Sequence, residues 1–218
     1  MIQFPEITEE EIERINKLQQ ESFDELYYLF EPPLPEGVPE RLEKIVELGK
    51  IKEGDTALDI GSGTGILIPI IMEYRPSRIY ACDLSSRMLE VLKQKFPTVV
   101  TLLSDIREVK LPDRSIDVAF LNACYPNIVD KKRAFLNLSR MLKSEGRIVI
   151  SYPLGKAFIK DLKKRVPYPL DEFPGGSEAK VLFNPFGLAI EDFVDEEKFY
   201  VLVLMKKHLA SHTKQFEE

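Results

Sequence analysis

Hydrophobic residues in the first fifty positions recur at helical spacing and predict two helices. In the first, over residues 8–30, Thr8 and Glu11 form a capping box that satisfies free N–H groups at the helix start. The proline-rich stretch that follows must end this helix, because proline removes a hydrogen-bond donor and fixes φ. A second helix is expected to begin at Pro39 and to end at Gly49, its C-cap.

From Thr56 onward the pattern changes to short apolar runs that alternate with helical stretches. Near-continuous apolar strands separated by helices predict βαβ units, with a parallel sheet that is covered on both faces. The strands of this part are expected at 56–60, 78–83, 99–103, 116–122 and 147–152. The helices between them are expected at 66–74, 86–96 and 131–142.

The order of elements changes again after the fifth strand. Two apolar runs, 189–194 and 198–207, close the domain with only three residues between them. A connection that short demands an antiparallel hairpin, because a parallel return needs a crossover of about a dozen residues or more. Before the hairpin, the sequence predicts a helix, a proline-rich stretch and a short helix at 155–166, 166–176 and 177–183.

Composition narrows the classes of function. The 218 residues suffice for one domain with a sizeable core, and the net charge of −6 argues against a nucleic-acid partner, which needs a basic face. Cys82 and Cys124 are too few and too distant for a disulfide framework or a metal site, so no metal is expected. The N-terminus lacks a signal-peptide core, and no run approaches the roughly 18 apolar residues of a membrane span, so a cytoplasmic location is expected.

Three alternating glycines join the first predicted strand to the helix after it. In DIGSGTG (59–65) they permit φ values closed to other residues and let a ligand lie against bare backbone. The helix N-terminus beyond them offers free N–H groups. An adenosine-containing ligand is therefore the natural expectation for this loop.

Three classes of glycine loop compete at this position. A P-loop requires a lysine followed by Ser or Thr, and this loop has no lysine. A dinucleotide loop requires Gly or Ala where this chain has Ile66, which weakens that class without removing it. The remaining pattern places an acidic residue, Asp59, before the glycines, and suits a ligand that carries a positive amine and a sulfonium.

Two further acids follow the next strands of the predicted sheet. Asp83 ends the second strand and Asp105 lies just past the third, and ligands of open α/β sheets sit at the carboxyl ends of strands. A carboxylate at Asp83 can accept hydrogen bonds from both ribose hydroxyls, and one at Asp105 can accept from an adenine amino group. Leu84, Met88 and Ile106 are expected to flank the adenine ring, although an inward helix residue such as Met88 more often belongs to the core.

Taken together, these motifs resemble the class I S-adenosylmethionine-dependent methyltransferases, particularly the small single-domain kind that act on small molecules. LDIGSGTG (58–65), CDLS (82–85) and SDI (104–106) are similar to their first, second and third motifs. LNACY (121–125) stands at the position of their fourth motif. Before the fifth strand, SEG (144–146) replaces their usual Pro-Gly turn.

The resemblance implies an α/β fold, a Rossmann-like three-layer sandwich around a seven-stranded, mostly parallel sheet whose last strand is antiparallel. It also implies a division of the chain. An N-terminal helical cap and proline-rich linker (1–39) precede an S-adenosylmethionine-binding methyltransferase domain (40–207), in which residues 153–185 form an insertion and a possible substrate lid. A flexible tail (208–218) follows.

The resemblance further implies S-adenosylmethionine as the cofactor and S-adenosylhomocysteine as its product. Asp59 and the first glycines would line the methionine end, Asp83 would hold the ribose, and Asp105 would hold the adenine. The backbone of Asn122 would lie near the cofactor amine. The full set of expected cofactor-binding residues is Asp59, Gly61, Ser62, Gly63, Gly65, Asp83, Leu84, Met88, Asp105, Ile106 and Asn122.

Methyl transfer in such an enzyme requires few catalytic side chains. The sulfonium is an activated methyl donor, so the protein mainly has to align a nucleophile with the methyl carbon. A general base is needed only for a protonated acceptor. Tyr125, after the fourth strand, is a weak candidate for that base, whereas His208 and His212 lie in the polar tail.

The expected function is methyl transfer to a small-molecule acceptor that the sequence does not name. A non-catalytic S-adenosylmethionine-binding module, a nicotinamide-dependent oxidoreductase and an RNA or protein methyltransferase stay open as alternatives. The oligomeric state is not readable. We interpret six aromatic residues as a lid over a modest apolar acceptor: Tyr27, Tyr28, Phe30, Tyr152, Tyr168 and Phe173.

Overall fold

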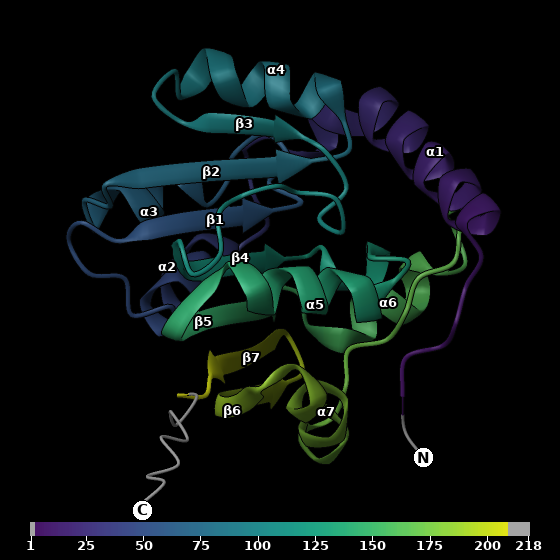
Figure 1. Ribbon diagram of the computed structural model, residues 1–218. Helices are drawn as coiled ribbons and strands as arrows, with labels where there is room; N and C mark the ends of the chain where they lie inside the picture. The colour runs from purple at the N-terminus through teal and green to yellow at the C-terminus, as the bar shows by residue number, and fades with distance from the viewer. Residues whose placement is uncertain (1–2, 209–218) are drawn as a thin grey trace, which may run out of the picture.

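A computed structural model describes residues 3–208 and places one mixed sheet between two layers of helices (Figure 1). The sheet order is β3-β2-β1-β4-β5-β7-β6, and β7 runs antiparallel to both of its neighbours. The predicted seven-stranded α/β sheet with an antiparallel last strand is therefore confirmed. The strands are β1 (Thr56–Ile60), β2 (Arg78–Asp83), β3 (Val100–Leu103), β4 (Ile116–Asn122), β5 (Leu142–Tyr152), β6 (Leu188–Glu196) and β7 (Phe199–Lys206).

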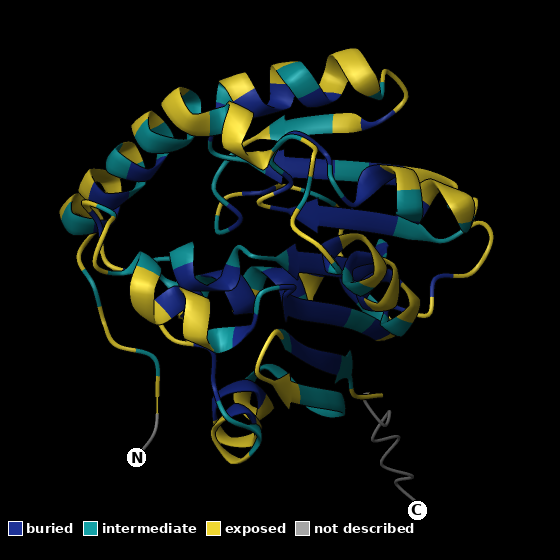
Figure 2. Ribbon diagram, turned by 180° about the vertical axis from the view of Figure 1, so that it is seen from behind, coloured by how far each residue is buried: buried dark blue, intermediate teal, exposed yellow. Residues whose placement is uncertain are grey.

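The central strands are apolar on both faces because helices cover both (Figure 2). Along β4, Val118 and Phe120 enter one core cluster, while Ala119 and Leu121 enter the other. This alternation is the two-residue period of a strand. In β5, likewise, Val149 belongs to the same cluster as Val118, whereas the residues next to it in the strand belong to the other cluster.

The helices divide between the two faces. Apolar residues of α2, α3 and α4 contribute to the first cluster, and those of α5 and α7 contribute to the second. The helices are α1 (Glu9–Leu26), α2 (Val38–Leu48), α3 (Ile68–Glu73), α4 (Ser86–Lys95), α5 (Lys131–Met141), α6 (Gly155–Leu162) and α7 (Gly176–Phe183), with 3-10 turns at Tyr27–Phe30, Tyr125–Asn127 and Asn184–Phe186.

Helix ends follow local signals. The Thr8 hydroxyl accepts a hydrogen bond of 3.3 Å from the backbone N–H of Glu11, and Gly49 is the C-cap of α2, as predicted. The helix expected at 155–166 is shorter, because α6 ends at Leu162. Irregular hydrogen-bonded turns continue from Lys163 to Val166, and Pro167 ends them because proline disfavours helical backbone at the residue before it.

The N-terminal helix α1 runs down the side of the molecule to which the arrowheads of β1, β2 and β3 point (Figure 1). Gln19 in α1 donates a hydrogen bond of 2.9 Å to the backbone carbonyl of Asn127, just past β4. Ile15 packs with Tyr168 and Leu170 of the segment between α6 and α7. This helix therefore covers the carboxyl ends of the strands, where the predicted ligand site lies. Within residues 3–208, none of the helices combines the length and apolar character that crossing a membrane requires.

Candidate functional site

The glycine loop curls over the end of the neighbouring strand. Gly61, Gly63 and Gly65 all adopt positive φ, at 63°, 52° and 90°, a region that favours glycine. The backbone N–H groups of Gly61 and Ser62 both donate to the carbonyl of Cys82, at 2.8 and 3.2 Å. The loop is thereby fixed at the carboxyl ends of β1 and β2.

The segment after β4 closes against the first glycine of this loop. A Cβ atom at Gly61 would lie 2.5 Å from Sγ of Cys124, closer than real Cβ contacts. Ala123, just before this cysteine, also has a positive φ of 55°. The absence of a side chain at Gly61 therefore allows the two loops to touch, with Cys124 packed against the glycine.

Asp83 is held between the glycine loop and the start of α4. Its Oδ2 accepts a hydrogen bond from Gly63 N–H, and its Oδ1 accepts one from Ser85 N–H, each at 2.9 Å. Burial raises the pKa of the Asp83 carboxyl, and the backbone hydrogen bonds oppose that rise. Each oxygen keeps acceptor capacity for a further donor, such as a ribose hydroxyl.

Asp59 is buried and incompletely satisfied. Its Oδ2 has no hydrogen-bond partner within residues 3–208, and neither has the buried Oγ of Ser62. Burial, and then the charge of Asp83, raise the pKa of Asp59 to about 8. Buried polar atoms are normally paired, so two orphaned oxygens beside a glycine loop indicate a place for a ligand that brings donors.

Asp105 already has protein partners. Its Oδ2 accepts hydrogen bonds from Asn16 of α1 at 2.6 Å and from Nε of Arg107 at 2.9 Å. Its Oδ1 accepts one from Arg107 N–H, also at 2.9 Å. Ser104, just before it, donates its N–H to the carbonyl of Asp83, which links this acid to the end of β2.

The other residues that were predicted to bind the cofactor lie around this crevice and differ in how far they are buried. Met88 and Ile106 are buried in the protein core, yet Sδ of Met88 lies 3.7 Å from where a Cβ of Gly63 would be. Leu84 is half-buried. The side chain of Asn122 accepts a hydrogen bond of 3.1 Å from the Ser151 hydroxyl, so its amide is oriented by β5.

Tyr125 points into the core formed by the second face of the sheet. Its ring stacks on Phe173 at 5.6 Å between centroids and contacts Phe135 and Phe183. Burial raises the pKa of its hydroxyl well above the ordinary value, which weighs against proton removal near neutral pH. A catalytic role for Tyr125 stays a prediction. His208 lies at the end of the described chain, and His212 and the rest of the predicted tail (209–218) lie outside the described residues.

The six aromatic residues interpreted as a lid do not form one cluster. Tyr152, Tyr168 and Phe173 are buried, whereas Tyr28 and Phe30 are exposed. Phe23 contacts both Phe30 and Tyr168. The aromatic contacts thus join α1 to the segment before α7, with Tyr152 and Phe173 deeper in the core.

Sequence reasoning missed the residues through which α1 reaches the site. Asn16 bonds Asp105, and Asp24 accepts a hydrogen bond from the Ser85 hydroxyl at the start of α4. Amphipathic spacing predicted this helix, but nothing in that spacing tells where the helix docks. No group of three or more His, Cys, Asp or Glu side chains suited to a metal ion is present in the described part of the chain.

The comparisons with known proteins agree on one family of enzymes. Residues 58–150 match the family described as a methyltransferase domain. An uncharacterized methyltransferase of Schizosaccharomyces pombe is 30% identical over 121 residues, 56% of this chain and 48% of that protein. A malonyl-(acyl-carrier protein) O-methyltransferase of Serratia marcescens is 33% identical over 109 residues, 50% of this chain and 42% of that protein. This chain thus spans about half or less of these relatives' length.

Solved structures show the same fold at lower identity. An S-adenosylmethionine-dependent methyltransferase of Mesorhizobium loti matches with a TM-score of 0.63 and 18% identity, over 78% of this chain and 100% of that one. This similarity shows the fold, and the domain match and the relatives confirm the resemblance to methyltransferases.

Proposed function

We propose, from the premise that this chain carries a class I methyltransferase domain, that it binds S-adenosylmethionine and transfers the methyl group to a small-molecule acceptor. When bound, the cofactor supplies an activated methyl group on a sulfonium. The chain itself then has to bind the cofactor, orient the acceptor and exclude water.

One observation carries the proposal: among the described residues, the buried Oδ2 of Asp59 has no hydrogen-bond partner. A carboxylate in that position is costly unless a cation or several donors satisfy it. The methionine end of S-adenosylmethionine carries an ammonium group, which supplies both the charge and the donors. Ser62, whose buried hydroxyl oxygen is also unpartnered, would accept a second hydrogen bond from the same end.

We assign the other predicted residues by the same argument. Asp83 would accept from the ribose hydroxyls with the acceptor capacity that Gly63 and Ser85 leave free. Asp105 would accept from the adenine amino group at Oδ1, because Oδ2 already has two donors. Gly61 and Gly65 would let the cofactor approach the backbone, and Leu84, Met88, Ile106 and Asn122 would complete the walls.

We keep the division into a cap (1–39), a methyltransferase domain (40–207) and an insertion (153–185) as part of this proposal. The contacts of Ile15 with Tyr168 and Leu170 support a lid made jointly by α1 and the insertion. A ligand that enters beneath α1 must pass this contact.

Calorimetric titration with S-adenosylmethionine, S-adenosylhomocysteine and NADH tests the proposal. We expect both sulfur ligands to bind and NADH not to bind. Asp59→Asn and Asp83→Asn should each weaken binding about tenfold or more, because each removes a charge-assisted contact to the cofactor. Exposed Glu10→Gln, in α1, is the matched control and should bind as the parent does.

The outcomes separate the candidate functions. Failure of well-folded protein to bind either sulfur ligand would overturn the proposal, and binding of NADH alone would favour the oxidoreductase. Binding followed by turnover with an acceptor panel, read as S-adenosylhomocysteine released, would exclude a non-catalytic binding module. Limited proteolysis within 166–176 tests the lid, which requires that cofactor plus acceptor slow cleavage there.

A further inference from the structure

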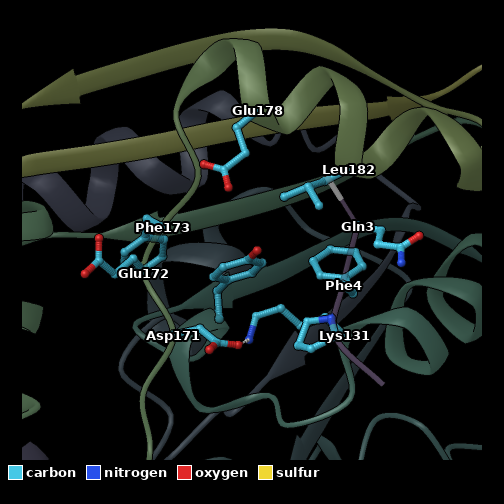
Figure 3. A pocket seen from close by; sticks show the side chains of 10 residues that line it. Gln3, Phe4, Lys131, Asp171, Glu172, Phe173, Glu178 and Leu182 are labelled. Atoms are coloured by element: carbon cyan, nitrogen blue, oxygen red, sulfur yellow. Dashed lines mark hydrogen bonds and ion pairs between the residues drawn. The ribbon is translucent and has the colours of Figure 1, made fainter. Parts of the chain in front are cut away.

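A cavity of about 270 Å³ lies outside the glycine-loop crevice, between the N-terminal segment, the start of α5, the segment before α7 and α7 itself. Figure 3 shows Phe4, Phe173, Lys131 and Glu178 arranged around it. Tyr125 also lines it. This residue directly follows Cys124, which touches the glycine loop, so the two sites lie on either side of one short segment.

The charges around this cavity do not cancel. Lys131 is the lining cation, and it is already engaged by the carboxylate of Asp171, by the carbonyl of Ile128 at 2.7 Å and by the face of the Tyr125 ring at 4.7 Å. The carboxylate of Glu172 pairs with Lys163 at 3.3 Å. Glu178 has no ion-pair partner within residues 3–208, and its carboxylate points into the cavity (Figure 3).

A second, independent feature is the hydroxyl of Tyr125. The residue is only 2% exposed, lines the cavity, and its hydroxyl has no hydrogen-bond partner in the described part of the chain. The hydroxyl of the neighbouring Tyr200, by contrast, donates to the carbonyl of Pro174 at 3.0 Å. The hydroxyl oxygen of Tyr125 is therefore open to the cavity, where a ligand or water can form a hydrogen bond with it.

The walls favour a cation over a neutral polar ligand. Phe4, Tyr125 and Phe173 give the lining its aromatic side chains, although the faces of the Tyr125 ring already contact Lys131 and Phe173. Glu178 supplies a full negative charge and Tyr125 an acceptor oxygen. An amine that is protonated near neutral pH can bind both of these groups, whereas a carboxylate would be repelled by Glu178, Asp171 and Glu172.

We propose that this cavity is a second binding site, for a small molecule that carries a protonated amine next to an apolar or aromatic group. The ammonium binds between the Glu178 carboxylate and the Tyr125 hydroxyl, and the apolar part packs between Phe4 and Phe173. The site does not depend on the assignment of the glycine-loop crevice to S-adenosylmethionine.

Three probes of nearly equal size test the charge preference: benzylamine, benzyl alcohol and benzoate, each titrated by calorimetry into the whole protein. We expect benzylamine to bind, benzyl alcohol to bind at least about tenfold more weakly, and benzoate not to bind. Equal binding of the three probes, or no binding of benzylamine to folded protein, would overturn the proposal.

Three single substitutions test where the amine binds. Glu178→Gln should weaken benzylamine binding about tenfold, and it keeps the α7 cap because glutamine can also accept from Gly175 N–H. Tyr125→Phe should weaken it several-fold while the ring remains. Asp59→Asn removes the buried carboxylate of the other crevice and should leave benzylamine binding unchanged. Loss of binding in Asp59→Asn but not in Glu178→Gln would place the amine in the glycine-loop crevice and contradict the inference.

Discussion

Asn16 in α1 donates a hydrogen bond of 2.6 Å from Nδ2 to Oδ2 of Asp105, a residue 89 positions later in the chain. The contact joins the N-terminal helix to the segment just past β3, beside the acids that line the glycine-loop crevice. Asp24, two turns further along α1, accepts from the Ser85 hydroxyl. Two side chains of one helix face thus bind two loops at the carboxyl ends of the strands.

The first prediction concerns this docking. Asn16→Ala should loosen α1 locally, because it removes a part-buried hydrogen bond to a carboxylate, worth about 1.5 to 3 kcal/mol. Hydrogen–deuterium exchange should show faster exchange over Glu9–Leu26 than in the parent, with the exchange of β1 and β4 unchanged.

A matched control lies on the same helix. Lys17 follows Asn16 directly, but its side chain is 77% exposed and pairs only loosely with Glu21 at 3.9 Å. Lys17→Ala should leave exchange of α1 as it is in the parent. Equal effects of both substitutions would mean that helix propensity, not the contact with Asp105, holds α1.

The second prediction follows from the pKa of Asp59, which is raised to about 8 in the folded chain from 3.8. The folded state therefore keeps a proton that the unfolded state has lost, and this contribution to stability is present below pH 4 and is lost as the pH rises through 8. Between about pH 5.5 and 7.5, the parent should lose about 2 to 3 kcal/mol of unfolding free energy that Asp59→Asn does not lose.

Urea unfolding at both pH values measures this difference. The comparison uses the change with pH in each protein, since an asparagine at a buried position has its own cost at every pH. Exposed Glu10→Gln should follow the parent's pH dependence. Parallel pH dependences for the parent and Asp59→Asn would show that Asp59 titrates near its ordinary pKa in the folded protein.

The ends of three central strands were predicted to the residue, because each strand is a short apolar run between turn or polar residues. The limits expected for β1, β2 and β4 are those observed, at Thr56–Ile60, Arg78–Asp83 and Ile116–Asn122. The start of β5 was predicted wrongly: the strand begins at Leu142 and includes residues 144–146, which were expected to form a turn before it. Likewise, α3 begins at Ile68 rather than at residue 66. The turns of the glycine loop extend to this point, since Ile68 N–H donates a hydrogen bond of 3.1 Å to the Gly65 carbonyl.

Only some residues of the candidate site were predictable from the sequence. Asp59, Asp83 and the glycines were predictable because each lies at or just past the carboxyl end of a strand, and these ends lie side by side in a parallel sheet. Asn16 was not, because its partner is determined by how a separate helix docks. Its hydrogen bond to Asp105, 89 positions away in the chain, is visible only in three dimensions.

The third prediction links the raised pKa of Asp59 to cofactor binding, and it rests on the proposed function. Near pH 7 the ligand-free carboxyl should be mostly protonated, since its pKa is about 8, and an ammonium group in contact with it favours the ionised form. Binding of S-adenosylmethionine should therefore release close to one proton. Calorimetry in phosphate and in Tris, which differ in ionisation enthalpy, measures the release. Asp59→Asn should show none, and a similar release by this variant would assign the proton to another group.

The last prediction tests why position 61 has no side chain. A Cβ at Gly61 would lie 2.5 Å from Sγ and 2.7 Å from Cβ of Cys124, and φ there is +63°. Gly187 has a similar φ of +72° but nothing within 4 Å of its Cβ position, so Gly187→Ala measures backbone strain alone, about 1 to 2 kcal/mol. Gly61→Ala should lower the unfolding free energy by about 1 to 3 kcal/mol more than that, because the clash adds to the strain. Adding Cys124→Gly should recover most of this excess and leave the strain, since it removes both the Sγ and the Cβ that the new methyl group would meet. No recovery in the double variant would show that the loop, and not Cys124, requires glycine.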